Sequence, residues 1–234
     1  MKQLTIVQRK ILITLLLISI LTVSMGFYMS NSTVALVTKI IQDVSKKSGD
    51  GDWKPANKGE SLTSGDRVKT GQKSLAVIKF LDNSIVRVRE QSELSISSEG
   101  PRGSATKTVQ LNGGSLGFDI KKQQNEQFRL TSPTSVASIR GTKGKMSGGS
   151  GTDTVIVTEG LVNLFNSLSE KNFDIIAGFI GFSTNDGSTS SREATPEELA
   201  DALNAATGGS ENELNLELRD SKGNKKELKI KYKQ

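Results

Sequence analysis

Residues 131–146, TSPTSVASIRGTKGKM, hold the strongest candidates for chemistry in this chain. Arg140 and Lys143 flank Gly141, and consecutive backbone N–H groups in such a turn can hold a carboxylate or a phosphate. The same turn also has an architectural interpretation, in which Gly141 adopts a backbone conformation closed to residues with a Cβ. We favour the architectural interpretation and keep the anion site as the alternative.

In the architectural interpretation each residue of the turn has a structural task. Arg140 folds back to hydrogen-bond backbone carbonyls or an acid, with Asp66 and Glu159 as candidate partners. Thr142 begins the next strand. The turn is then a clamp between strands.

The composition argues against catalysis. The chain has no Cys and no His, which removes thiol nucleophiles, Ser-His and Cys-His pairs, and zinc sites built on those residues. No nucleophile elbow is present. Asp50 and Asp52 lack the twelve-residue pattern of a calcium loop. We therefore expect a protein that is not an enzyme, with no cofactor and no metal.

The net charge of +6 does not indicate a nucleic-acid partner. Lys2, Arg9 and Lys10 supply half of it, and beyond them bases and acids are largely interspersed, apart from a lysine-rich C-terminus. Nucleic-acid binding needs a concentrated basic patch or stripe, so we do not expect it.

The N-terminus predicts a membrane segment. Residues 11–28 contain no charged residue and would form roughly 27 Å of helix, enough to cross a hydrocarbon core. The basic residues before them should stay in the cytoplasm. We expect residues 1–30 to form a cytoplasmic stub and a single-pass anchor in a bacterial inner membrane, with the rest in the periplasm. A cleaved signal peptide is the alternative.

The body, residues 34–182, alternates apolar and polar residues with a period of two, which is typical of half-buried strands. Gly141, Gly160 and Gly178 lie 19 and 18 residues apart, a spacing that suits successive strand-and-turn layers. We predict an all-β domain of short strands, β-solenoid-like or a β-roll. A two-sheet sandwich remains the alternative.

The C-terminal part has a different pattern. Residues 183–194 are almost free of apolar side chains and read as a flexible linker. Within residues 195–234, Thr195 predicts a helix N-cap with Glu198 closing a capping box, and Gly208 ends the helix. Leu199, Ala202 and Leu203 would form its apolar stripe.

The tail that follows looks like a β-hairpin. Alternating apolar residues mark its two arms, namely Leu214, Leu216 and Leu218, then Leu228, Ile230 and Tyr232. A lone hairpin is marginal in water, so the helix, the β domain or a partner must cover it.

Trp53 is the single tryptophan. It could stack on a sugar or on a partner's side chain. We favour packing in the core at one end of the roll.

Several of these stretches together resemble the extracytoplasmic domain of FecR-type proteins, the iron-citrate regulator family of bacterial envelopes. The resemblance covers roughly residues 36–182. The matching positions are Trp53, Gly59, Leu62, Gly65, Asp66, Thr70, Asp82-Asn83-Ser84, Ser92, Leu94, Thr131, Pro133, Arg140, Gly141, Thr142, Glu159, Gly160 and Gly178. Asn83 replaces the usual Gly, and one serine is inserted between Thr131 and Pro133.

The resemblance implies a roll-like periplasmic domain that works through protein contacts. Full regulators of this family carry a folded anti-sigma region before the membrane segment, where this chain has ten residues. We therefore expect a sensor or scaffold that binds another envelope protein. The alternatives are a module that binds cell-wall or surface polysaccharide, and a transmembrane regulator of an extracytoplasmic-function sigma factor through a separate cytoplasmic partner.

Overall fold

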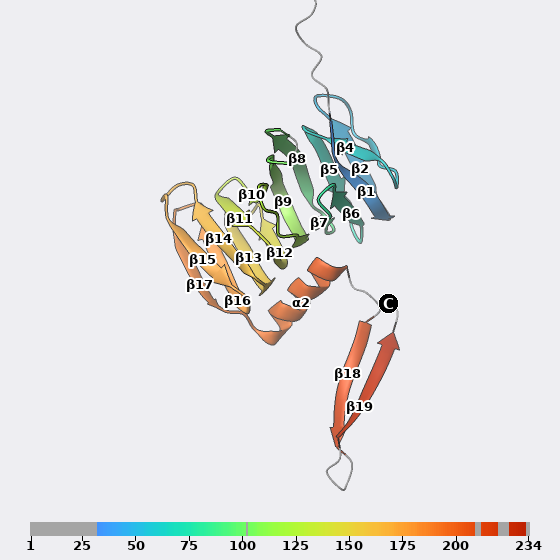
Figure 1. Cartoon of the computed structure of the whole chain (residues 1–234), viewed down its shortest axis with the longest axis vertical. Coiled ribbons are helices and arrows are strands. Elements are labelled where there is room, and N and C mark those ends of the chain that lie inside the picture. The colour runs from blue at the N-terminus through green and yellow to red at the C-terminus, as the bar shows by residue number, and fades with distance from the viewer. Residues whose placement is uncertain (1–31, 102, 209–211, 220–224, 233–234) are drawn as a thin grey trace, which may run out of the picture. The chain divides into compact units, whose positions relative to one another are not determined.

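The computed structural model describes residues 32–101, 103–208, 212–219 and 225–232 (Figure 1). The expected anchor, residues 11–28, lies outside these ranges. Within them, no helix is both long and apolar enough to cross a bilayer.

The body consists of two sheets, here sheet A and sheet B, that share one long strand, β9 (Thr106–Ile120). Sheet A contains, in spatial order, β4 (Ser61–Thr63), β1 (Thr33–Ile41), β6 (Leu75–Phe80), β7 (Ile85–Val88), the second half of β9, β12 (Thr142–Gly148), β13 (Thr152–Glu159), β16 (Phe179–Thr184) and β17 (Thr189–Glu193). Sheet B contains β3 (Lys54–Pro55), β2 (Val44–Ser48), β5 (Asp66–Thr70), β8 (Glu93–Glu99), the first half of β9, β10 (Gln127–Thr131), β11 (Ser135–Ile139), β14 (Leu161–Asn166) and β15 (Asn172–Ile176).

Beyond the first few strands, both sheets follow the order of the chain, because the chain passes repeatedly from one sheet to the other. β9 makes the clearest crossing, since it pairs with β8 up to Gly113 and with β12 from Gly114 onward. The next strand, β10, returns to sheet B and pairs with β9 in parallel. The all-β prediction is confirmed, and the sheet is not closed. The two stacked sheets resemble a β-sandwich, whereas the repeated passage of the chain from one sheet to the other resembles a β-roll.

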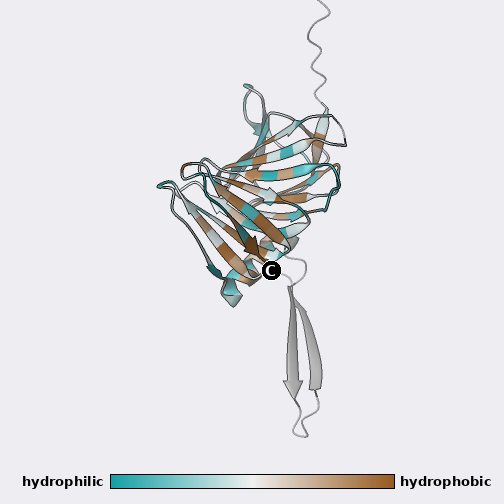
Figure 2. Ribbon diagram, turned by 60° about the vertical axis from the view of Figure 1, so that its left-hand side comes forward, coloured by the Kyte–Doolittle hydropathy of each residue, from teal (hydrophilic) through white to brown (hydrophobic). Residues whose placement is uncertain are grey.

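Side-chain alternation builds the core between the two sheets, as the alternating colours along the strands in Figure 2 show. The rings of Phe80 from sheet A and Phe128 from sheet B meet edge to face, with centroids 5.0 Å apart. Removing a buried ring of this kind typically costs about 3–5 kcal/mol. Other fully buried side chains include Leu62, Ile78, Leu94, Leu111, Leu116, Phe118 and Leu164.

The prediction of a flexible linker over residues 183–194 was wrong. Its first two residues complete β16, and Thr189–Glu193 forms β17, which pairs antiparallel with β16. Nearly all of β17 is exposed, so it needs no apolar alternation and is held by backbone hydrogen bonds. Polar composition therefore indicated an edge strand, not a flexible segment.

Helix α2 (Pro196–Thr207) begins and ends as predicted. Thr195 accepts a hydrogen bond from the N–H of Glu198, whose carboxylate accepts from the N–H of Thr195, and Gly208 ends the helix in the left-handed conformation with φ of 86°. Of the predicted stripe, Leu203 is 49% exposed, so that part was wrong. The buried residues are Ala202, Ala205 and Ala206.

Small side chains are needed because α2 lies very close to sheet A. A Cβ added to Gly117 of β9 would lie 1.9 Å from the carbonyl oxygen of Ala205. Arg87 of β7 donates to the carbonyl of Ala206, one of the last helical carbonyls without an intrahelical partner. Burial there lowers the pKa of Arg87, and the charge of Asp119 opposes the shift.

The C-terminal hairpin is confirmed at the level of the backbone. β18 (Asn212–Arg219) and β19 (Lys225–Tyr232) pair antiparallel, with Leu214 opposite Ile230 and Leu216 opposite Leu228.

Candidate functional site

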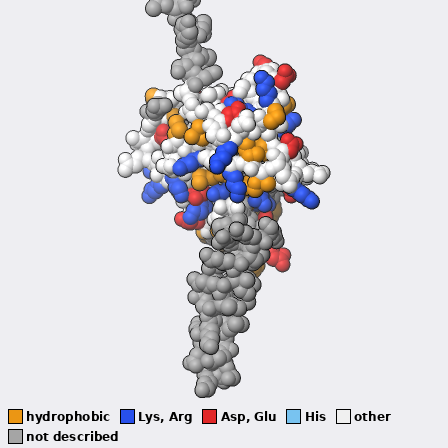
Figure 3. Space-filling model, turned by 90° about the vertical axis from the view of Figure 1, so that its right-hand side faces the viewer, with side chains coloured by type: hydrophobic (Ala, Val, Ile, Leu, Met, Phe, Trp, Pro, Cys, Tyr) orange, Lys and Arg blue, Asp and Glu red, His pale blue; other side chains and the backbone are white. Residues whose placement is uncertain are grey.

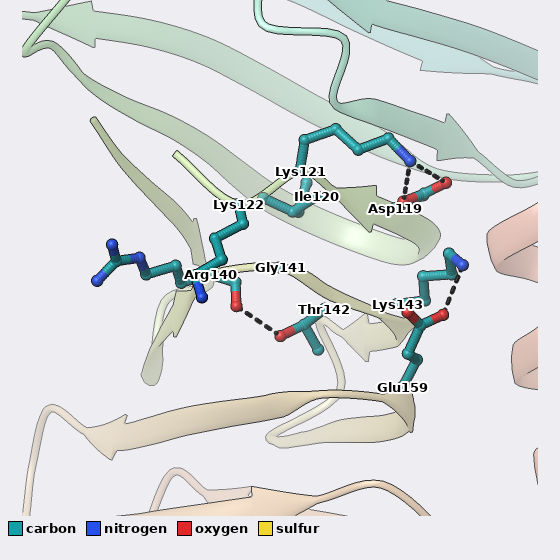
Figure 4. A pocket seen from close by; sticks show the side chains of 9 residues that line it. All are labelled: Asp119, Ile120, Lys121, Lys122, Arg140, Gly141, Thr142, Lys143 and Glu159. Atoms are coloured by element: carbon teal, nitrogen blue, oxygen red, sulfur yellow. Dashed lines mark hydrogen bonds and ion pairs between the residues drawn. The ribbon is translucent and has the colours of Figure 1, made fainter. Parts of the chain in front are cut away.

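The Arg-Gly-Thr turn joins β11 of sheet B to β12 of sheet A and borders an open depression of about 640 Å³. The lining comes from the end of β9, the segment after it, the turn itself and the end of β13 (Figure 4). The residues are Asp119, Ile120, Lys121, Lys122, Arg140, Gly141, Thr142, Lys143 and Glu159.

Gly141 has the predicted positive φ, 66°. The neighbouring Gly160, with φ of 87°, packs directly against it. A Cβ on Gly160 would lie 2.7 Å from the carbonyl oxygen of Gly141 and 2.8 Å from the hydroxyl of Thr142. The Arg-Gly-Thr and Glu-Gly turns therefore meet backbone to backbone, which leaves no room for a side chain.

Thr142 begins β12, as predicted, and is buried. Its hydroxyl donates to the carbonyl of Leu161 at 2.8 Å and accepts from the N–H of Leu161 at 3.3 Å. One side chain thus ties the start of β12 to the start of β14.

Arg140 is exposed, and its Nε donates to the carbonyl of Gln123 at 3.1 Å. The expectation of a carbonyl partner is confirmed. The expected acids are wrong, because both have other lysine partners. Glu159 accepts a hydrogen bond from Lys143 at 2.5 Å.

The second expected acid, Asp66, is the first residue of β5, directly after the turn at Gly65. It is buried, accepts from the N–H of Thr63 at 2.8 Å and pairs with the ammonium of Lys46 at 3.1 Å. Gly65, with φ of 92°, donates its N–H to the carbonyl of Ile96 at 2.8 Å. This turn is therefore a second architectural clamp.

The third glycine of the series extends the same arrangement. Gly178 has a φ of 89° and donates its N–H to the carbonyl of Val157 at 2.9 Å. The preceding Ala177 donates to the carbonyl of Gly160 at 3.1 Å. The spacing of Gly141, Gly160 and Gly178 thus predicted a real succession of turns.

The depression is predominantly basic. Lys121 pairs with Asp119 at 3.1 Å, and the hydrogen bond to Glu159 raises the pKa of Lys143. Within the described ranges, the Lys122 ammonium makes no hydrogen bond or ion pair, and the Arg140 guanidinium meets only a carbonyl. The site can attract anions.

Thr131 and Pro133, the other half of the signature, are not brought to this depression. They lie at the opposite end of β11. There Ser132, Thr134 and Ser135 donate to one carboxylate oxygen of Asp153, with a distance of 2.7 Å from Ser135. The inserted serine is therefore part of a hydroxyl cluster around a buried acid. Sequence reasoning missed Asp153, although its inward parity in β13 was a usable signal.

The prediction that Trp53 packs in the core was wrong. It is half-buried and outside the core, with the ammonium of Lys69 4.4 Å from its ring centroid. β3, which follows it, is a two-residue edge strand, so the ring lies on the outside of sheet B. Tryptophan and lysine form a cation–π pair there.

Lys107 is a further residue that sequence reasoning missed. It is 6% exposed and bridges Asp82, at 2.7 Å, and Glu126. Its place in β9 has the same parity as the buried Val109 and Leu111. This parity was the available signal. In the described part of the chain, no three carboxylates are grouped as metal ligands.

Fold and turns together define a layered β domain whose signature residues join successive strands. Residues 66–163 match the family model described as FecR protein, and this part of the chain is similar to that family. No curated protein has a significantly matching sequence.

Two crystal structures of a Parabacteroides distasonis protein, provisionally described as an anti-sigma factor, are similar in fold. The first has a TM-score of 0.51 and 10% identity, over 64% of this chain and 66% of that chain. The second has the same score and identity, over 67% and 70%. This chain therefore spans just under two thirds of the first structure. At this identity, the similarity concerns the fold alone.

Proposed function

We propose that this chain is a membrane-anchored, extracytoplasmic FecR-like protein that binds another envelope protein as a sensor or scaffold and catalyses no reaction. Residues 11–28 would cross the bacterial inner membrane, with the β domain in the periplasm. The FecR match supports a regulatory role. The use of the signature residues as clamps between strands supports a binding role for the remaining surface.

One observation carries the binding role, an exposed apolar pair at the edge of sheet B. Leu161 of β14 and Ile176 of β15 lie directly opposite each other and are 44% and 50% exposed. β15 pairs only with β14 among the described strands. An edge strand with exposed apolar side chains is a template for pairing with another chain.

Such an edge suits β-augmentation, in which an extended partner segment adds a strand. Main-chain hydrogen bonds supply affinity, and the Leu161–Ile176 pair would contact alternate side chains of the added strand. The next cross-strand pair is polar, with Asn163 donating to Asp174 at 2.8 Å. A partner strand with an apolar residue followed by a polar one on this face would match.

The polysaccharide alternative is not proposed. It has weaker support, because the ammonium of Lys69 already lies over one face of the Trp53 ring that would stack on a sugar. A transmembrane regulator acting through a separate cytoplasmic partner stays the second candidate, because the FecR match supports it.

Site-specific photo-crosslinking in intact cells tests the binding role. A photoreactive residue at Ile176 should give a discrete adduct with an envelope protein. The same residue at Leu203, which is 49% exposed on α2, is the matched control and should give none. Ile176→Glu should abolish co-purification of the captured protein. Equal labelling from both positions, or turnover of a glycan or peptide by the exported region, would refute the proposal.

A further inference from the structure

A continuous surface links the start of β1 to the Arg-Gly-Thr turn. We call it the basic end and define it as Leu81, Lys121, Lys122 and Arg140. Leu81 follows β6 directly, is 54% exposed, and donates its N–H to the carbonyl of Val34 at 3.3 Å.

Hydrogen bonds connect the segment around Leu81 to Arg140. The side chain of Gln123 donates to the carbonyl of Asp82 at 3.2 Å, and Arg140 donates to the carbonyl of Gln123 at 3.1 Å. The N–H of Lys121 donates to the hydroxyl of Ser84 at 3.1 Å. The residues of the basic end therefore form one patch.

The patch combines three exposed cations with one exposed leucine. Only Lys121 has an acidic partner among the described residues, Asp119. In Figure 4 the Lys122 side chain extends toward Arg140, whose guanidinium points away from the turn. A Cβ on Gly141 would lie 3.2 Å from the Cβ of Lys122, so Lys122 packs against the turn that carries Arg140. Adjacent like charges repel and favour a shared anion.

The short connection between the expected anchor and β1 limits how far the basic end can lie from the membrane. The uncharged segment ends at Tyr28 and β1 begins at Thr33. The five residue-to-residue steps from Tyr28 to Thr33 span at most about 18 Å. The headgroup region is roughly 5–8 Å thick on each side of a bilayer. If residues 11–28 are an anchor, the start of β1, and with it Leu81, lies within about 13 Å of the outer headgroup surface.

We propose that the basic end docks on the outer surface of the anchoring membrane by binding the phosphates of anionic lipid headgroups. Lys122 and Arg140 contact phosphates, and Leu81 enters the interface. This inference rests on the anchor in the proposed function and adds the surface and the lipid chemistry that orient the β domain. The edge strand β15 remains available for a protein partner.

Depth-dependent quenching on the full chain in vesicles tests the inference. The chain has no cysteine, so single cysteines at Leu81 and Gln72 can carry one fluorophore each. Gln72 is exposed in the turn before β6, whereas Leu81 lies after this strand of six residues, roughly 20 Å away. The quencher is a lipid with a nitroxide on its headgroup.

In vesicles that contain phosphatidylglycerol, quenching at position 81 should exceed that at position 72 several-fold. In phosphatidylcholine vesicles the difference should shrink. Added salt should reduce it in the anionic vesicles, because salt screens exposed charges. Equal quenching at both positions, or equal values in both lipids, would overturn the inference.

Charge reversal supplies the specific test. Lys122→Glu with Arg140→Glu should remove the effect of phosphatidylglycerol at position 81. Lys73→Glu with Lys171→Glu makes the same change in net charge at exposed turns elsewhere and should leave it intact. If the variant with Lys122→Glu and Arg140→Glu does not fold, the salt titration of the unaltered chain tests the inference instead.

Extraction with alkaline carbonate separates this inference from the proposed function. A retained chain with no preference for position 81 refutes the docking and leaves the anchor intact. A chain released by carbonate refutes the anchor, and the docking inference falls with it.

Discussion

The hydroxyl of Thr142 bonds to both backbone groups of Leu161, as donor to the carbonyl and acceptor from the N–H. Thr70 makes a related clamp, since its hydroxyl accepts from the N–H of Ser92 at 3.1 Å and donates to the carbonyl of Arg89 at 2.5 Å. A threonine hydroxyl offers one donor and two acceptor positions, so it can serve both groups at once. The roll therefore uses related clamps in its N-terminal and C-terminal halves.

Thr142→Val should destabilise the domain by about 1–3 kcal/mol, because the part-buried backbone groups of Leu161 would lose the hydroxyl that bonds to them. Thr142→Ser keeps the hydroxyl and should restore most of the loss. Chemical denaturation of the three proteins measures the free energy of unfolding. Equal stability of the valine variant and the unaltered chain would contradict the clamp.

Gly117→Ala should displace α2 from sheet A, since the added Cβ would meet the backbone of Ala205 at 1.9 Å. Overpacking of this kind typically costs about 1–3 kcal/mol. Gly113→Ala, in the same strand, is the matched control because nothing lies within 4 Å of its added Cβ. Limited proteolysis should cut the helix region earlier in the first variant alone. The same cleavage rate in both variants would show that the contact does not hold the helix.

The strands and the ends of α2 were predictable because their causes are local. The alternation in residues 75–80 and 161–166 predicts both the strand and its buried face. The ends of α2 depend only on the capping residues Thr195, Glu198 and Gly208. Gly141 was predictable for the same reason, since its turn demands a positive φ.

The remaining features depend on residues distant in sequence. That Glu159 bonds to Lys143 and not to Arg140 follows from the strand register, which the sequence does not give. The buried face of α2 was also hidden, because the close approach of Ala205 to Gly117 joins positions 88 residues apart, and Leu203 lies off that face. β17 was missed because its sequence has no alternation, and its pairing with β16 depends on residues outside the segment.

Lys107→Met should destabilise the domain by about 3–5 kcal/mol, since it leaves Asp82 and Glu126 facing each other without their buried cation. Combining it with Asp82→Asn and Glu126→Gln should recover much of the loss, because no uncompensated charge remains. The melting temperatures of the single and the triple variant, compared with that of the unaltered chain, measure both the loss and the recovery. If the single variant were as stable as the unaltered chain, the ion cluster would contribute nothing.

Glu198 links the stability of the α2 N-terminus to pH. Its hydrogen bonds with Arg192, and with the N–H of Thr195, lower its pKa from 4.5 to about 2. The fold therefore favours the ionised carboxylate. Its contribution is fully present above pH 4.5 and is lost as the pH falls through about 2.

Glu198→Gln should therefore flatten the loss of thermal stability between pH 4.5 and 2 without abolishing it, because hydrogen bonds from Thr184 and Ser188 also lower the pKa of Asp186 to about 2. Asp186→Asn should flatten the same window independently, and the double variant should show the sum of both effects since the two acids share no partner. Melting temperatures measured across this pH range decide it. A Glu198→Gln variant with the unaltered pH dependence would show that the capping box does not require the charge.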